Sequence, residues 1–150
     1  MNPDATRTPP AVRLERFVPA PPEKVFAAWT RPDLLARWYA PAPASVGAAE
    51  VDLRVGGAWR IRMDAPEGRV YTAHGIYRAV DAPRRLVFTF DWAEEENRMG
   101  VETLVTVDFQ AVDGGTRVAL AHEGLPGTEQ ADGHASGWTA CLEQLASALD

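Results

Sequence analysis

The segment that decides the fold is His134-Ala-Ser-Gly-Trp-Thr-Ala-Cys-Leu-Glu-Gln-Leu-Ala-Ser-Ala-Leu149, which follows the turn sequence Gly124-Leu-Pro-Gly127. Its larger and more apolar residues recur at helical spacing, which predicts an amphipathic helix: His134, Trp138, Cys141, Leu142, Leu145 and Leu149. No other part of the chain carries so long an apolar stripe. We therefore predict a terminal helix over residues 134–149 that covers one face of a sheet.

Most of the chain before this helix alternates between apolar and polar residues, as half-buried strands do. The alternation predicts seven strands: 12–18, 49–55, 59–63, 71–80, 86–92, 103–109 and 118–122. Short turn sequences such as Asp113-Gly-Gly115 separate them and favour antiparallel pairing. Gly75, inside the fourth strand, predicts a β-bulge.

Two short helices are predicted between the first and second strands. One begins at Pro22 and ends before the break at Arg31-Pro32-Asp33; the other runs from Leu34 to Tyr39. The predicted class is therefore α+β, with a curved antiparallel sheet of about seven strands around the terminal helix. The two short helices close one open end of the sheet and leave room for an internal cavity.

Length and composition limit the function. The chain has 150 residues, 46% hydrophobic and 24% charged, and a net charge of −6. These values predict one domain over residues 11–150, after a disordered, proline-rich tail over residues 1–10. The negative charge argues against nucleic acid and anionic lipid as partners. No apolar run reaches the ~18 residues of a membrane span, and no signal peptide is visible, so we expect a cytoplasmic protein.

The sequence shows no arrangement of residues typical of a catalytic or metal site, and it implies no cofactor. His74, His122 and His134 lack the spacing of metal ligands, and the single cysteine, Cys141, is expected to pack in the core. His122 shares strand parity with the apolar Val118 and is predicted to point to the covered face, where it needs a partner from protein, water or ligand.

The carboxylates of the predicted strands lie opposite to the apolar face and are expected to face solvent: Asp52, Asp91, Glu102 and Asp108. Glu94-Glu-Glu96 is predicted to be a solvated hairpin tip, with a partner-binding site as the alternative.

The inward-facing aromatic residues carry the functional hypothesis. Together with two other inward residues they are predicted to line one small-molecule cavity: Trp38, Trp59, Tyr71, Phe88, Phe90, Trp92, His122, Trp138 and Leu142. The alternative is that these side chains simply fill the core. An apolar cavity with a few polar groups is the usual form of a small-molecule site.

The chain also resembles the SRPBCC superfamily (START-like, birch-pollen-allergen-like), and within it the homologues of the activator of the heat-shock protein 90 ATPase. The resemblance covers about residues 12–149. It rests on Pro22-Glu-Lys-Val-Phe-Ala-Ala-Trp29, Leu35-Ala-Arg-Trp38, Val55-Gly-Gly57, Gly75-Ile-Tyr77, Pro83-Arg-Arg-Leu-Val-Phe-Thr-Phe90, Gly115-Thr-Arg-Val118, His122-Glu-Gly-Leu-Pro126 and Gly137-Trp138 with Leu142 and Leu145.

The resemblance implies the helix-grip fold, whose members bind lipids, hormones and polyketide-like molecules, while a few are enzymes. It carries no catalytic residue over to this chain. The leading hypothesis is the binding of a hydrophobic or aromatic small molecule between the sheet and the terminal helix. The alternatives are a cyclase- or hydrolase-type enzyme that uses His122 as acid or base, and a chaperone-regulating interaction module. A homodimer through an edge strand is compatible with the sequence but not required by it.

Overall fold

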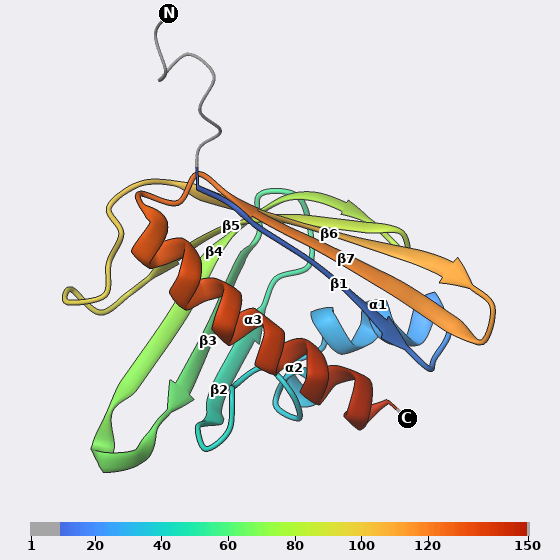
Figure 1. The fold of residues 1–150 in the computed structure, drawn as a ribbon, viewed down its shortest axis with the longest axis horizontal. Coiled ribbons are helices and arrows are strands. Elements are labelled where there is room, and N and C mark those ends of the chain that lie inside the picture. Colours follow the sequence, from blue (N-terminus) through green and yellow to red (C-terminus); the bar gives the residue numbers. More distant parts are fainter. Residues whose placement is uncertain (1–9, 150) are drawn as a thin grey trace, which may run out of the picture.

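The computed structural model describes residues 10–149, and within them seven strands form one antiparallel sheet (Figure 1). The strands are β1 (Val12–Val18), β2 (Ser45–Val51), β3 (Ala58–Asp64), β4 (Val70–Asp81), β5 (Arg85–Trp92), β6 (Thr103–Val112) and β7 (Gly115–Glu123). Their order across the sheet is β1-β7-β6-β5-β4-β3-β2, so each strand from β2 to β7 lies beside its neighbour in sequence. Only β1 crosses over to pair with β7.

The long helix α3 (Thr128–Ala148) lies across the concave side of the curved sheet, which confirms the predicted α+β arrangement (Figure 1). The short helices α1 (Pro22–Thr30) and α2 (Pro32–Leu35) follow β1 and close the end of the sheet beside the C-terminal half of α3. A single 3-10 turn, η2 (Pro66–Gly68), joins β3 to β4. The predicted tail of residues 1–10 lies, except for Pro10, outside the described residues.

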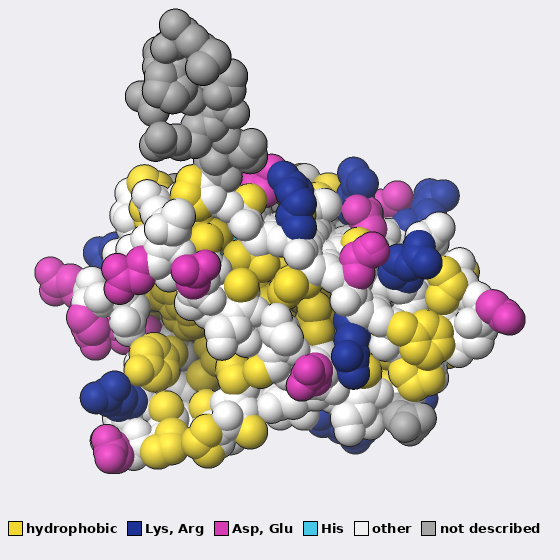
Figure 2. All heavy atoms as spheres, viewed as in Figure 1, with side chains coloured by type: hydrophobic (Ala, Val, Ile, Leu, Met, Phe, Trp, Pro, Cys, Tyr) yellow, Lys and Arg dark blue, Asp and Glu magenta, His cyan; other side chains and the backbone are white. Residues whose placement is uncertain are grey.

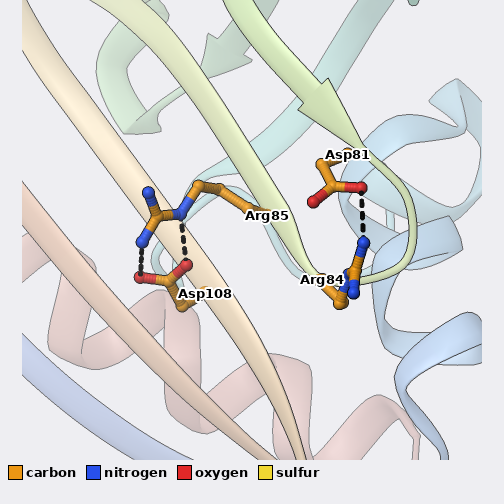
Figure 3. Close-up of polar contacts among 4 residues, drawn as sticks. All are labelled: Asp81, Arg84, Arg85 and Asp108. Carbon is orange, nitrogen blue, oxygen red and sulfur yellow. Dashed lines mark hydrogen bonds and ion pairs between the residues drawn. The ribbon is translucent and has the colours of Figure 1, made fainter.

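The alternation read from the sequence matches the two faces of the sheet. On β5, Leu86, Phe88 and Phe90 are buried beneath the helices. The opposite face carries an ion pair in solvent, in which Arg85 of β5 donates from Nε to Oδ1 of Asp108 on β6 at 2.6 Å (Figure 3). In the turn between β4 and β5, Arg84 pairs with Asp81, the last residue of β4 (Figure 3). Exposed pairs of this kind contribute about 0–1 kcal/mol each, so burial of the inner face is the main stabilising term.

Among the predicted elements, three have clearly different bounds in the structure, each for a local reason. The second short helix begins at Pro32 rather than Leu34, inside the predicted break, because proline is well accommodated in the first helical turn. It ends at Leu35 rather than Tyr39, because residues 36–40 form turns in which the N–H groups of Trp38 and Tyr39 both bond to the Leu35 carbonyl. Strand β2 runs from Ser45 to Val51 rather than over 49–55, since the chain turns at Asp52–Gly57 although its alternation continues.

The third difference is the start of the last helix. Helix α3 begins at Thr128, six residues before His134. Its first turns, Thr128 to Gly133, are polar apart from Ala131, and therefore give no apolar period in the sequence.

Gly75 does not form the predicted bulge. It pairs in register with Trp59, and the register shift between β4 and β5 lies between Tyr77 and Ala79. The structure nevertheless requires glycine here, because a Cβ on residue 75 would lie 1.8 Å from the backbone oxygen of Thr89. Where the two strands come this close, the N–H of Ile76 bonds to the Thr89 hydroxyl instead of to backbone.

We predict that Gly75→Ala destabilises the protein by about 1–3 kcal/mol or more, because the new methyl group forces two backbones apart. Urea unfolding followed by tryptophan fluorescence measures the change. Gly133→Ala in α3 is the matched control, since its Cβ meets no atom within 4 Å and alanine gains roughly 1 kcal/mol of helix propensity. Equal stabilities of the two variants would contradict the close approach of β4 and β5.

Candidate functional site

A buried chain of hydrogen bonds ties α3 to the sheet at its centre. The indole N–H of Trp138 donates to Nδ1 of His122 on β7 at 3.1 Å. Nε2 of His122 lies 2.9 Å from the hydroxyl of Thr103 on β6, and that hydroxyl donates to the backbone oxygen of Phe90 on β5. His122 and Thr103 are fully buried, so three neighbouring strands and the helix share one polar connection inside an apolar core.

The directions of these bonds fix the protonation state of His122. An indole N–H only donates, so Nδ1 of His122 must be the acceptor and the proton sits on Nε2, which donates to Thr103. Burial lowers the pKa of His122 to about 3, and the nearby His134 contributes to the shift. His122 is therefore neutral at physiological pH, and both of its ring nitrogens are hydrogen-bonded to protein groups.

A second tryptophan–histidine hydrogen bond joins α3 to the sheet. Here the histidine, His134, lies on the helix, one turn before Trp138. Its Nε2 accepts the indole N–H of Trp92 at 3.1 Å, so its Nδ1 carries the proton and donates to the backbone oxygen of Gln130 at 2.7 Å. The two histidine rings lie edge to face, 5.1 Å apart. Trp92 and Trp138 are thus held in fixed orientations by two histidine rings.

Beside these rings lies a cavity of about 460 Å³ between α3 and the sheet. Four parts of the chain line it: α3 (Glu129, Gln130, Gly133, His134, Gly137, Trp138 and Cys141), strands β3 to β5 (Met63, Tyr71, Phe90 and Trp92), the β5–β6 connection (Glu96, Asn97 and Met99), and the turn after α2 (Tyr39 and Pro41). Figure 2 shows apolar side chains in the hollow beside the first half of α3. The volume lies within the roughly 300–1,000 Å³ of small-molecule sites.

Two glycines keep the helix side of this cavity open. A Cβ on Gly133 or Gly137 would meet no atom within 4 Å, so no neighbouring side chain or strand demands glycine at either position. Glycine in a helix costs roughly 1 kcal/mol relative to alanine. What the two glycines provide is space, because both residues line the cavity.

The β5–β6 connection, residues 93–102, forms the opposite wall and is held by two carboxylates. Asp91 accepts the backbone N–H groups of Met99 and Gly100, so it is half-buried and does not simply face solvent as predicted. Partial burial favours a raised pKa for Glu94, but the bond that it accepts from the Thr72 N–H outweighs this and the net shift is downward. The predicted solvated tip is therefore anchored at Glu94, while Glu96 lines the cavity.

The nine residues predicted to line the cavity divide into two groups. Tyr71, Phe90, Trp92 and Trp138 line it. Trp38, Trp59, Phe88, His122 and Leu142 are buried elsewhere in the core. Trp38 packs on Trp29 with its N–H bonded to the Ala28 oxygen, and Trp59 packs on Phe88 and Phe90.

Sequence reasoning found only part of the face of α3 that lines the cavity. The predicted stripe includes His134, Trp138 and Cys141, but it missed Gln130, Gly133 and Gly137, which share their helical spacing. The helical spacing of these residues is visible in the sequence. Because they are polar or glycine, however, the apolar pattern that predicts an amphipathic helix does not include them.

Two buried groups of the cavity lining, the Cys141 thiol and the Tyr39 hydroxyl, stay protonated at neutral pH. Burial raises the pKa of the Cys141 thiol to about 12, and its S–H donates to the backbone oxygen of Tyr39, so it is not a thiolate at neutral pH. The Tyr39 hydroxyl also stays protonated, because burial first, and the neighbours Cys141 and Tyr77 second, raise its pKa. Among residues 10–149, no group of three or more histidine, cysteine or acidic side chains is arranged to hold a metal ion.

A second hollow, of about 590 Å³, lies on the outer side of β3 to β5. Charged residues line much of it, among them Glu50, Arg60, Asp91 and Glu102. It has few aromatic side chains in its lining and therefore suits an apolar ligand less well than the cavity beneath α3.

In the part of the chain that the structure describes, no helix is long and apolar enough to cross a membrane.

A curved antiparallel sheet that grips one long helix above an apolar cavity defines the class of helix-grip proteins, in agreement with the resemblance noted in the sequence. The family described as "Activator of Hsp90 ATPase homolog 1-like protein" matches residues 19–150, and the chain belongs to this family.

Solved structures show the same arrangement. A protein from Chromobacterium violaceum is 27% identical and superposes with a TM-score of 0.86, over 95% of this chain and 98% of that one. The AHSA1 protein from Silicibacter pomeroyi is 31% identical with a TM-score of 0.81, over 91% of this chain and 95% of that one. No curated protein matches the sequence.

The neutral state of His122 predicts a pH dependence of stability. Its folded pKa, about 3, lies below its ordinary value of 6.5, so between these values the unfolded chain binds more protons. The contribution of His122 is therefore present above about pH 6.5 and is lost as pH falls towards 3, by up to about 1.4 kcal/mol per pH unit.

Urea unfolding between pH 4 and 7 measures this dependence against His122→Asn, which keeps an acceptor for Trp138 but does not titrate. We expect the free-energy difference between the two proteins to shrink by about 2–3 kcal/mol from pH 6 to pH 4. A difference that stays constant with pH would show that His122 is not held neutral by the fold.

Proposed function

We propose that the protein binds an apolar or aromatic small molecule in the 460 Å³ cavity between α3 and strands β3 to β5. The observation that carries the proposal is that the cavity is both apolar at its base and kept open. Aromatic side chains from β4, β5 and α3 line it, while glycines replace side chains along the helix. A fold under no demand for such a space would gain stability by filling it with alanine or larger residues.

Burial of the ligand supplies the binding free energy. Each 100 Å² of apolar surface removed from water contributes about 2.5 kcal/mol, before the entropic cost of binding. The walls are also preorganised, because Trp92 and Trp138 are each bonded to a histidine that has no free nitrogen. A ligand therefore meets rings that are already oriented, which lowers the cost of ordering the site.

The alternatives have less support. An enzyme that uses His122 as acid or base needs a histidine that titrates near neutral pH and reaches substrate. Here the pKa of His122 is about 3, and its ring lies outside the cavity lining with both nitrogens bonded. Regulation of a chaperone rests on the family description alone, and a homodimer and a cytoplasmic location stay predictions.

The proposal predicts that Gly137→Leu abolishes binding without loss of stability. A Cβ on residue 137 meets no atom within 4 Å and the residue lines the cavity, so the leucine side chain takes up space that the ligand needs. Leucine also favours the helix over glycine by roughly 1 kcal/mol. The probe is N-phenyl-1-naphthylamine, a neutral aromatic molecule that fluoresces in apolar surroundings. We expect its affinity for the variant to fall about tenfold or more, which corresponds to about 1.4 kcal/mol.

Ser136→Leu is the matched control, because it adds the same side chain to the exposed face of α3 one residue earlier. This control should bind the probe as the unaltered protein does. Unchanged probe affinity in Gly137→Leu, or no binding by the unaltered protein, would count against the cavity as the site.

A further inference from the structure

The charges around the cavity point to the class of its ligand. Two carboxylates line it, Glu96 from the β5–β6 connection and Glu129 from the first turn of α3, and both residues are exposed at its mouth. No lysine or arginine of residues 10–149 is among the lining residues. Figure 2 shows acidic side chains gathered on this side of the molecule, around the β5–β6 connection and the start of α3.

The aromatic walls favour the same sign of charge. Tyr71 and Trp92 have ring centroids 6.2 Å apart at an interplanar angle of 73°, and Phe90 and Trp92 lie 5.2 Å apart at 88°. Rings that meet at near right angles offer π-faces in several directions to a group seated beside them. A cation within about 6 Å of such a ring centroid is attracted to it, whereas an anion is repelled.

Two features that attract anions lie close by, and neither supplies a free positive site in the cavity. The N-terminus of α3 is the positive end of the helix dipole, but Glu129 already stands in its first turn. Arg98 belongs to the same connection as Glu96, but its guanidinium donates to the Ala93 oxygen and it does not line the cavity.

From this arrangement we propose that the cavity selects organic cations, molecules with an aromatic or apolar body and an ammonium group, over carboxylates of the same shape. The body packs against Trp138, Phe90 and Met63, while the ammonium group lies at the mouth near Glu96, Glu129 and the faces of Tyr71 and Trp92. Fatty and aromatic acids, which have the same apolar bodies, enter with an unpaired negative charge beside two carboxylates. The inference rests on the proposed binding function and narrows its ligand class.

The experiment compares three probes with one ring system and different charges: 1-naphthylmethylammonium, the neutral 1-naphthylmethanol and 1-naphthoate. Each probe is titrated as a competitor of N-phenyl-1-naphthylamine on the unaltered protein, at pH 7 and about 20 mM salt, where electrostatic screening is weak. Each exposed carboxylate changes the affinity of a nearby charge by a factor of roughly 1.5–5, and the rings add to this. We therefore expect the cation to bind about tenfold more tightly than the anion.

The double variant Glu96→Gln/Glu129→Gln tests whether these carboxylates are the cause. We expect the cation-to-anion ratio to fall to about twofold to threefold, the remainder coming from the rings, while the affinity for 1-naphthylmethanol is unchanged. In the unaltered protein, about 0.5 M salt should reduce the ratio in the same direction. Arg98→Gln is the matched control on the same connection, and it should leave the preference for the cation in place.

The outcomes separate this inference from the proposed function. Tighter binding of the cation that depends on Glu96 and Glu129 supports both. If the neutral probes bind but the anion binds as well as the cation or better, the charge preference is overturned and the cavity stands as the binding site. Loss of 1-naphthoate binding in Arg98→Gln would likewise overturn it, by showing an anion site at that arginine. If no probe binds, both proposals fail.

Discussion

The structure depends on how Trp138 is buried. Its indole packs against Trp29 of α1, Tyr39 and Phe90, while its N–H needs an acceptor inside an apolar core. His122 supplies that acceptor from β7, and Thr103 and the Phe90 carbonyl complete the connection across β6 and β5. A buried donor without a partner costs about 1–3 kcal/mol, so the helix is fixed at this point in both position and rotation.

Fixing α3 at its midpoint divides it into two halves with different surroundings. Beyond Trp138 the helix packs closely through Cys141, Leu142 and Leu145. Before Trp138 only Ala131 is buried among the described residues of the helix, and Gly133 and Gly137 face open space. The cavity follows from this division, because the closely packed half holds the helix in place, while in the first half Gly133 and Gly137 leave space between the helix and the β5–β6 connection.

Burial sets the protonation state of three groups in and beside the site. Burial keeps His122 neutral and raises the pKa values of Tyr39 and Cys141, so these groups do not exchange protons near neutral pH. Each histidine near the cavity instead orients a tryptophan, and one carboxylate, Asp91, orders the loop that forms the opposite wall. The charges left at the mouth, Glu96 and Glu129, are free of such structural bonds among the described residues, and therefore act on whatever enters.

Residue alternation and helical period were enough to determine the element order, the antiparallel sheet, the Asp113–Gly114 hairpin turn and the inward direction of His122, because strand parity and apolar stripes are local properties. The same local patterns did not determine which residues line the cavity. Phe88 and Phe90 have the same parity on the same strand, yet only Phe90 reaches the open space. Which aromatic residues line a cavity and which fill the core depends on where α3 stands over the curved sheet. That position is set by long-range contacts such as Trp138 to His122, so the tertiary structure alone decided it.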